Sequence, residues 1–223
     1  MKVIARIRTP FPEKFGVPRQ SGLVDSLKAQ IVFEEEYRSA DAVRGLDGFS
    51  HIWLIWQFSG AVREGWSPTV RPPRLGGNTR MGVFATRSPF RPNAIGLSSV
   101  KLTAVEEHPQ YGTVLRVAGA DLMDGTPIYD IKPYLTTTDC HPEASKGFTN
   151  IHTDYTLPVD IPDYLLKNFP KNKIAALKAV LAQDPRPAYH HDENRRYGFD
   201  FAGHEIAFVV KNEKIVVTEI TKK

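Results

Sequence analysis

Short runs of β-branched and aromatic residues, separated by glycine and proline, constrain the fold of this chain more than any other feature. Such runs are typical of strands, and Gly and Pro between them are typical of turns. The runs are Val3 to Ile7, Ala29 to Phe33, Ile52 to Phe58, Gly82 to Ala85, Leu97 to Val105 and Thr113 to Ala118. Since helical periodicity is weak between them, we predict a mainly β fold whose N-terminal domain is an antiparallel β-barrel without exposed edge strands.

The character of the sequence changes after Tyr134, where a polar stretch with Pro and Gly offers few apolar side chains to bury. We place a domain boundary there, with residues 1–138 in the barrel domain and residues 139–223 in a small C-terminal α+β domain. Within the second domain, apolar spacing between Pro162 and Gln183 predicts two helices joined by a turn. The final stretch alternates around Lys211 to Glu213, which predicts a β-hairpin.

The bulk properties narrow the class of protein. The 223 residues suffice for one substantial core with a small appended domain. A formal charge of +4 is only mildly basic, so an anionic partner must be recognised locally. The single cysteine, Cys140, precludes an internal disulfide and fits a reducing compartment. The charged, proline-broken first residues do not resemble a signal peptide, and no apolar run could span a bilayer, so we expect a cytoplasmic protein without membrane contact.

An arginine-rich stretch, residues 69–100, is the main chemical signal. The familiar nucleotide-binding motifs, GxGxxG in a βαβ unit and GxxxxGK[ST], do not occur. Instead five arginines alternate with Pro and Gly: Arg71, Arg74, Arg80, Arg87 and Arg91. Guanidinium groups this close together repel one another, so a bound anion or carboxylate would relieve the repulsion. A solvated basic loop, or Arg stems packed over the barrel end, explains the pattern equally well.

Residues 82–98, GVFATRSPFRPNAIGLS, resemble the signature of the TsaA-like family, whose bacterial members are called TrmO. The resemblance continues, in the same order, in residues 13–23, 40–58, 66–78, 121–134 and 182–189, so that it covers both domains. It implies a β-barrel methyltransferase that uses S-adenosylmethionine (AdoMet). The implied substrate is the exocyclic N6 of threonylcarbamoyladenosine, a modified nucleoside beside the anticodon of certain tRNAs, and the implied assembly is a homodimer.

The resemblance also implies a set of cofactor contacts. AdoMet presents a carboxylate, an ammonium group, ribose hydroxyls and a flat adenine, which require a cation, an acid, closely approaching backbone and apolar walls. We expect Arg87 to bind the carboxylate and Asp124 to bind the ammonium group or the ribose. Phe58 and Leu97 are expected to enclose the adenine. The complete set is Gln20, Ser21, Gly22, Phe58, Ser59, Arg87, Leu97, Asp124, Gly125, Thr126 and Pro127.

Several of these positions have simpler explanations. Residues 124–127, DGTP, form an ordinary turn sequence. Phe58 ends an apolar run and fits a core position. Ser59 precedes Gly60 and suits a turn.

Contacts with the tRNA anticodon stem-loop are expected at Arg74, Arg91, Asn93, Lys132, Arg186 and Tyr189. Arg and Lys can bind phosphates or the threonylcarbamoyl carboxylate, and Tyr189 can stack on an unpaired base. A rigid linker in which Asp184 pairs with Arg186 explains the last segment equally well. Methyl transfer should depend mainly on placement, and Asp124 or Asp130 is the candidate acceptor of the proton that N6 loses.

No metal site is expected. The side chains of adjacent residues such as His190 and His191 point in different directions, and they have no Cys or carboxylate at ligand spacing. Two other functions fit the residues: a barrel hydrolase or lyase acting on a small anion, and a non-enzymatic RNA-binding module. No nucleophile and base stand out for the first, and the modest charge and missing RNA-stacking motifs disfavour the second.

Overall fold

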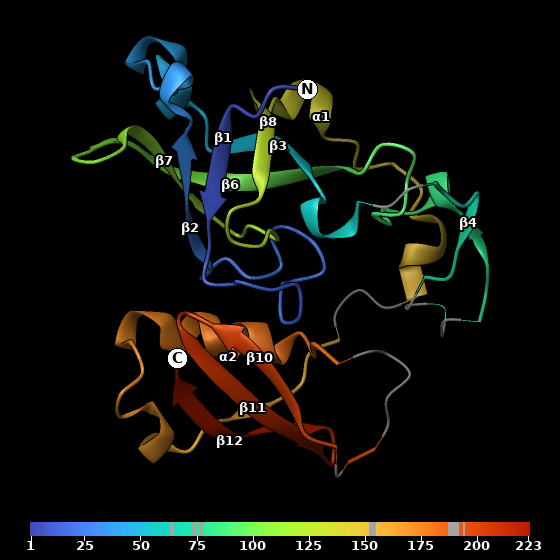
Figure 1. Cartoon of the computed structure of the whole chain (residues 1–223). Helices are drawn as coiled ribbons and strands as arrows, with labels where there is room; N and C mark the ends of the chain where they lie inside the picture. The colour runs from blue at the N-terminus through green and yellow to red at the C-terminus, as the bar shows by residue number, and fades with distance from the viewer. Residues whose placement is uncertain (63–64, 73–74, 76–77, 152–154, 187–191, 194) are drawn as a thin grey trace.

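The computed structural model describes residues 1–62, 65–72, 75, 78–151, 155–186, 192–193 and 195–223 (Figure 1). The strands are β1 (Ala5–Arg8), β2 (Lys28–Phe33), β3 (His51–Gln57), β4 (Thr69–Val70), β5 (Met81–Gly82), β6 (Ile95–His108), β7 (Gly112–Ala118), β8 (Pro127–Pro133), β9 (Val159–Asp160), β10 (Tyr197–Phe201), β11 (His204–Lys211) and β12 (Lys214–Lys222). The α-helices are α1 (Thr136–Asp139) and α2 (Ile174–Ala182). The mainly β prediction is confirmed.

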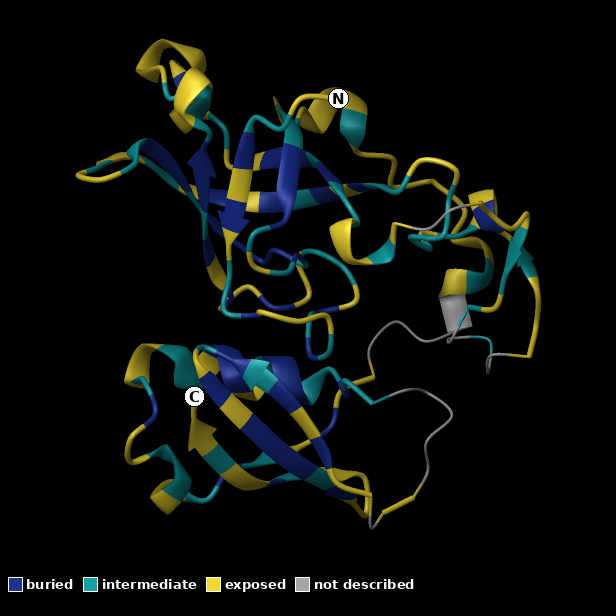
Figure 2. Ribbon diagram, in the orientation of Figure 1, coloured by how far each residue is buried: buried dark blue, intermediate teal, exposed yellow. Residues whose placement is uncertain are grey.

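Six strands of the N-terminal part pair in the order β1-β2-β7-β6-β3-β8, and β8 pairs back to β1, so the sheet closes into a barrel. Every pair in this ring is antiparallel. β3 shows why the sequence folds this way, because Ile52, Leu54 and Trp56 alternate with more exposed residues and point into the core. Figure 2 shows the same alternation of buried and exposed positions around the barrel.

Two expectations about this part need correction. The strand predicted over residues 82–85 is wrong, since Val83–Ala85 forms a 3-10 turn and only Met81–Gly82 pairs, with β4. Conversely, β8 lies in a stretch to which no strand was assigned. Its polar residues, Asp130 and Lys132, and its closing Pro133 hid the strand pattern, although Pro127 and Ile128 are buried in the barrel.

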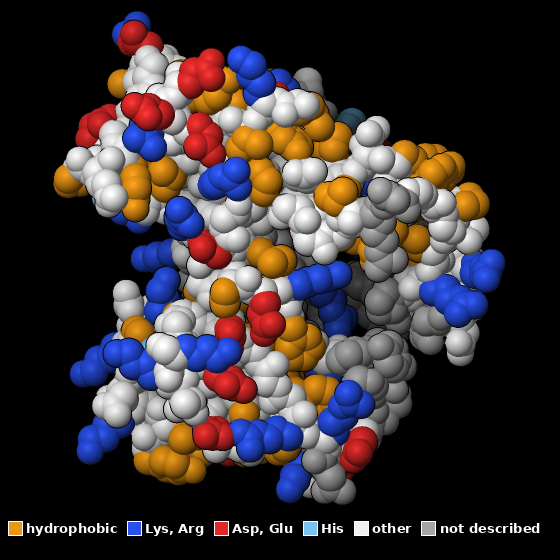
Figure 3. Space-filling model, viewed as in Figure 1, with side chains coloured by type: hydrophobic (Ala, Val, Ile, Leu, Met, Phe, Trp, Pro, Cys, Tyr) orange, Lys and Arg blue, Asp and Glu red, His pale blue; other side chains and the backbone are white. Residues whose placement is uncertain are grey.

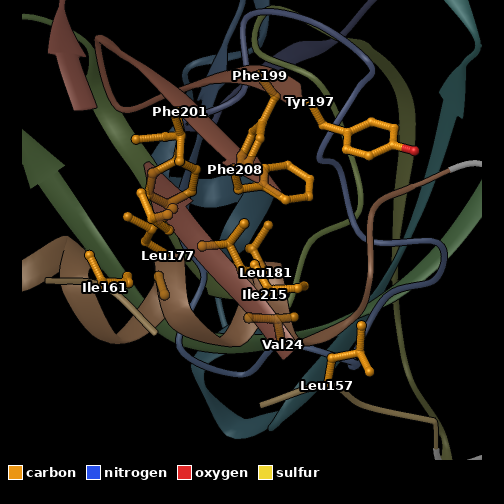
Figure 4. Close-up of a cluster of buried hydrophobic side chains, with 14 of the residues drawn as sticks. Val24, Leu157, Ile161, Leu177, Leu181, Tyr197, Phe199, Phe201, Phe208 and Ile215 are labelled. Carbon is orange, nitrogen blue, oxygen red and sulfur yellow. The ribbon is translucent and has the colours of Figure 1, made fainter. Parts of the chain in front are cut away.

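The C-terminal part is a four-stranded sheet in the order β10-β11-β12-β9 with α2 packed against it. Its core is aromatic, and Figure 4 shows Phe199, Phe201 and Phe208 packed with Leu177 and Leu181 of the helix. The predicted hairpin is confirmed as β11 and β12. Of the two helices predicted before it, one is α2, and short 3-10 turns take the place of the other.

The two parts are joined by the loop between β1 and β2. Phe11, Val24 and Leu27 of this loop are buried in the core of the C-terminal sheet. The N–H of Ala202 donates to the carbonyl oxygen of Pro10 at 2.9 Å. Segments from both ends of the chain therefore share one core, and the boundary placed after residue 138 stays a prediction.

The face of the molecule in Figure 3 carries Lys and Arg interspersed with Asp and Glu over both parts. This distribution fits the small net charge of +4. Among the described residues, every helix is too short or too polar to cross a lipid bilayer.

Candidate functional site

One rim of the barrel brings distant segments together. Because neighbouring strands are antiparallel, the loops after β1, β3 and β7 lie at the same end of the barrel. The loop of residues 19–22 crosses this rim, where the N–H of Gly22 donates to the carbonyl oxygen of Gly119 (2.9 Å). Both glycines have positive φ, and a Cβ on Gly119 would lie 3.3 Å from the Cα of Gly22. The close approach explains glycine at position 119, and the positive φ favours glycine at both positions.

The rim loop is held from both sides. The guanidinium of Arg87, which precedes β6, donates to the side-chain oxygen of Gln20. On the other side, the guanidinium of Arg19 donates to the carbonyl oxygen of Asp184 in the C-terminal part (3.1 Å). Arg87 is exposed, so its remaining N–H groups can bind an anion from solvent.

A carboxylate that was not among the predicted site residues lies under this loop. Asp121 accepts a hydrogen bond from the hydroxyl of Ser98 in β6, with 2.6 Å between the oxygens. Ser98 is buried and accepts in turn from the indole N–H of Trp56 in β3 (3.0 Å). The backbone N–H of Ser21 also bonds to Asp121. We call Gln20, Ser21, Gly22, Arg87 and Asp121 the rim cluster, which Ser98 supports from inside the barrel.

Two opposing influences set the pKa of Asp121. Burial raises it above the ordinary value, because the charged form loses its water. The hydrogen bonds from Ser98 and Ser21, and the nearby positive charge of Arg87, act in the opposite direction but do not cancel the effect of burial.

Of the remaining predicted cofactor residues, Phe58 lies near the rim cluster and Leu97 does not. The ring of Phe58 is 4.3 Å from that of Trp56, centroid to centroid, and it packs against the barrel core, as its simpler explanation requires. Ser59 begins a 3-10 turn, Ser59–Ala61, and is exposed. Leu97 alternates with buried Ser98 along β6 and is 56% exposed on the outer surface of the barrel.

The turn of residues 124–127 is fixed to the end of β1. The carboxylate of Asp124 accepts from the N–H of Thr9 (3.0 Å) and pairs with Arg8 (3.5 Å). Gly125 donates its N–H to the carbonyl oxygen of Ile7 at 2.8 Å, with φ at +73°. Thr126 and Pro127 are buried. These contacts give the turn a structural role at the rim, whatever it binds.

The other candidate proton acceptor, Asp130, lies in β8 and pairs with Lys132 at 2.8 Å. Its second oxygen accepts from the N–H of Ile131 (2.9 Å). Both charged side chains are more than 40% exposed, so this pair is weak and either partner can turn to a ligand.

The residues predicted to bind RNA are dispersed. Arg91 donates to the carbonyl oxygens of Val83 (3.3 Å) and Thr86 (2.8 Å) and lies over the ring of Phe84. Arg186 makes a two-pronged ion pair with Asp184, at 2.8 and 2.9 Å, which confirms the pairing considered for this segment. Arg74 and Tyr189 lie outside the described residues.

A cavity of about 520 Å³ lies outside the rim, on the outer surface of β3, β6 and β8. Arg91 and Asn93 line it, together with Gln57, Trp66, Phe90 and Tyr129. We call this space the outer cavity. Its walls mix aromatic rings with amide and guanidinium groups, which suits a nucleobase better than a purely apolar ligand.

The histidines give no support for a metal site. His204 is buried, bonds to the carbonyl oxygen of Ala202 (2.9 Å) and packs edge-on against Phe169. His190 and His191 lie outside the described residues. In the part of the chain that is described, no three His, Cys, Asp or Glu side chains are grouped to hold an ion.

The rim cluster meets the chemical demands of AdoMet. It offers an exposed guanidinium at Arg87 for a carboxylate, the acid Asp121 beside it, and glycine backbone at Gly22. Phe58, partly buried beside Trp56, adds an apolar wall. Asp121, Ser98 and Trp56 were missed in the sequence because their partners lie 23 and 42 positions apart along the chain.

Comparison with known proteins identifies relatives over most of the chain. The family model described as the tRNA-methyltransferase O N-terminal domain matches residues 6–140, and the TrmO C-terminal domain matches residues 165–223. A tRNA (adenine(37)-N6)-methyltransferase from Escherichia coli (strain K12) is 44% identical, with 91% of this chain and 94% of the relative covered. The enzyme of the same name from Eikenella corrodens is 42% identical, over 77% of this chain and 97% of the relative.

The fold also matches solved structures. A crystal structure of TrmO from Pseudomonas aeruginosa superposes with a TM-score of 0.78 at 29% sequence identity, covering 99% of this chain and 98% of the other. A putative S-adenosylmethionine-dependent methyltransferase named RcsF from the same species is 38% identical over 87% of this chain and 85% of the relative.

Proposed function

Because this chain belongs to the tRNA-methyltransferase O family, we propose that it methylates N6 of threonylcarbamoyladenosine at position 37 of tRNA, next to the anticodon. It is an AdoMet-dependent tRNA (adenine-N6)-methyltransferase. The observation that carries the AdoMet part of this proposal is the rim cluster, where Arg87 bonds to Gln20 of a distant loop near Asp121.

The rim cluster is the proposed cofactor site. Arg87 binds the carboxylate of the cofactor, and its hydrogen bond to Gln20 fixes the direction of the guanidinium. The backbone of Ser21 and Gly22 approaches the cofactor closely, and Phe58 forms an apolar wall. Ser59 and the turn of residues 124–127 complete the proposed contacts, and Leu97, exposed on the outer surface of the barrel, is withdrawn from them.

When bound, AdoMet supplies a methyl group on a positively charged sulfur, so the leaving group departs neutral. The chain's own residues then have to align the acceptor nitrogen with that methyl group and exclude water. N6 forms the new N–C bond, and its proton must pass to a base. Asp124 and Asp130 are the proposed acceptors, and they pair with Arg8 and Lys132 respectively.

The tRNA is proposed to bind across both parts of the chain. Arg91 and Asn93 line the outer cavity, which has room for an unpaired base, and Lys132 lies on the neighbouring strand. Arg74, Arg186 and Tyr189 are proposed to extend this surface along the anticodon stem-loop. Arg186 must then exchange its pair with Asp184 for a phosphate.

The setting of this activity is also a proposal. We place the enzyme in the cytoplasm, as a homodimer, with a barrel domain of residues 1–138 and an α+β domain of residues 139–223. The two family-model matches, which end at residue 140 and resume at residue 165, support a division near the proposed boundary.

The experiment that tests the function uses two tRNA pools that differ only in threonylcarbamoylation. Purified protein is incubated with methyl-labelled AdoMet, and the tRNA nucleosides are separated by mass spectrometry. Label on N6 of threonylcarbamoyladenosine alone is the expected result. Label on unmodified adenosine 37 would overturn the substrate, and absence of AdoMet binding by calorimetry would overturn the function.

The methylation activity of the Asp124→Asn and Asp130→Asn variants tests which of the two residues accepts the proton. The variant that loses its base should show a lower kcat that recovers as the pH rises, because free hydroxide then replaces the base. Asp41→Asn, a surface change on the same domain, is the matched control.

A further inference from the structure

Asp121 is a partly buried acid between two positions of the barrel core. Its neighbours Ala120 and Leu122 are buried in the barrel core, 3% and 1% exposed. Placing a carboxylate in such surroundings is unfavourable unless hydrogen bonds and charges compensate it. Asp121 has such compensation on both sides, from Ser98 inside the barrel and from the loop above it.

A need to stabilise the barrel interior does not explain why a carboxylate occupies this position. The buried indole N–H of Trp56 already has an acceptor in the hydroxyl oxygen of Ser98. Ser98 can direct its own proton to any nearby acceptor, so the core needs no negative charge. What needs the charge lies on the other side, where the N–H of Ser21 bonds to Asp121 and the positive charge of Arg87 acts on it without direct contact.

The bond from Ser21 and the attraction of Arg87 link Asp121 to the two elements that the cofactor requires. The loop of residues 19–22 is fixed to the rim at Gly22 and at Ser21, and Arg87 is directed by Gln20 of the same loop. Without the carboxylate, Ser21 loses its acceptor and Arg87 loses the nearby negative charge. The loop would then sample positions in which the guanidinium and the backbone no longer converge.

We propose that Asp121 is a positioning residue of the cofactor site, whose carboxylate fixes the rim loop through Ser21 and holds Arg87 in place for the cofactor carboxylate. This inference rests on the proposed function, since it concerns how the same site binds AdoMet. It assigns Asp121 no contact with the reacting atoms.

Asp121→Asn tests the role with little change of shape. Its amide oxygen still accepts from Ser98, but the charge beside Arg87 is gone. If that oxygen stays bonded to Ser98, the NH₂ group of Asn faces the N–H of Ser21. Two donors then meet, and the N–H of Ser21 has no acceptor. Hydrogen bonds to charged groups are stronger than neutral ones, and we expect AdoMet affinity to fall about tenfold. At saturating AdoMet, kcat should change by less than about twofold, because the loss is in binding.

A matched pair of variants separates positioning from structural support. Ser98→Ala leaves the buried indole of Trp56 without its acceptor, so it should lower the melting temperature, while AdoMet affinity stays within about threefold of wild type because the charge of Asp121 remains. Asp121→Asn should show the reverse pattern. Asp41→Asn, on an exposed surface pair with Arg44, controls for loss of a carboxylate.

The experiment measures AdoMet dissociation constants by calorimetry, melting temperatures, and kcat with KM for AdoMet on the full chain. Weaker AdoMet binding by Asp121→Asn at an unchanged melting temperature supports the inference. Wild-type affinity in this variant, or a fall in kcat with unchanged KM, overturns it while the proposed function stands. If Asp121→Asn does not fold, Asp121→Ser is measured against the same expectations. Wild-type protein that does not bind AdoMet overturns the function itself.

Discussion

The rim cluster and the arm of residues 59–94 use similar residues in different ways. At the rim, Arg87 of the arm donates a hydrogen bond to Gln20 of a distant loop. Beneath that loop, Trp56 donates to Ser98, and Ser98 donates to Asp121. In the arm, Arg91 turns back to the carbonyl oxygens of Val83 and Thr86 and holds the arm's own backbone. Two arginines four positions apart thus have opposite tasks, one joining segments and one shaping a single segment.

The aromatic residues of the two regions differ in the same way. Trp56 is 6% exposed and hydrogen-bonded, whereas Trp66 and Phe84 of the arm are 53% and 69% exposed and stack on each other, with 6.0 Å between ring centroids. The difference indicates that the rim is fixed in advance for a small ligand. The arm presents surface that a larger partner can cover.

The largest expected effect concerns the packing beneath the rim. A Cβ on Gly96 would lie 2.3 Å from the indole of Trp56, so Gly96→Ala forces the ring to move. We expect a loss of about 2–3 kcal/mol in the free energy of unfolding from overpacking, and hence a melting temperature lower by roughly 4–12 °C. Thermal unfolding checks this, with Gly82→Ala as control because nothing lies near a Cβ there. Equal melting temperatures would show that Trp56 is loosely held.

The next largest effect is expected when the positive charge of Arg87 is removed from the rim. Arg87→Ala should weaken AdoMet binding by about 2 kcal/mol, or roughly 30-fold, the strength of a charge-assisted hydrogen bond. Calorimetry measures the affinity, and Arg80→Ala, another exposed arginine of the arm, is the control. Unchanged affinity would remove Arg87 from the site.

The matching change in the arm should act elsewhere. Arg91→Ala removes the donor to two carbonyl oxygens, and we expect about 1 kcal/mol of lost stability together with a higher KM for tRNA. AdoMet affinity should stay within about twofold of wild type. A loss of AdoMet binding comparable to that of Arg87→Ala would erase the distinction between the two regions.

The smallest effect is expected for the exposed aromatic pair. Phe84→Ser should change the free energy of unfolding by less than about 0.5 kcal/mol, because most of the ring is already in water. Chemical denaturation measures this, and a loss above about 2 kcal/mol would mean that the arm is packed more firmly than its exposure indicates.

The sequence predicted the features that are encoded locally. Runs of β-branched and aromatic residues between Gly and Pro located five of the six barrel strands, and alternation around Lys211 to Glu213 located the final hairpin. It failed where local pattern and tertiary role diverge. Val83 to Ala85 has strand composition but no partner strand on either side, and β8 is polar on the side that faces away from the core.

The candidate site was predictable only in part for the same reason. Gln20 and Arg87 were identified through family resemblance, but the resemblance could not tell that they bond to each other. The residues around Asp121 in the sequence do not indicate its role, because that role depends on bonds with Ser98 and Ser21. Only the folded barrel brings these residues close to Asp121.

Hydrogen–deuterium exchange of the full chain, with and without AdoMet, tests most directly where the cofactor binds. We expect slower exchange in peptides that contain residues 19–22 and 119–121, with little change around Trp66 and Asn93 of the outer cavity. Protection confined to the outer cavity, with the rim loop exchanging as before, would contradict this expectation.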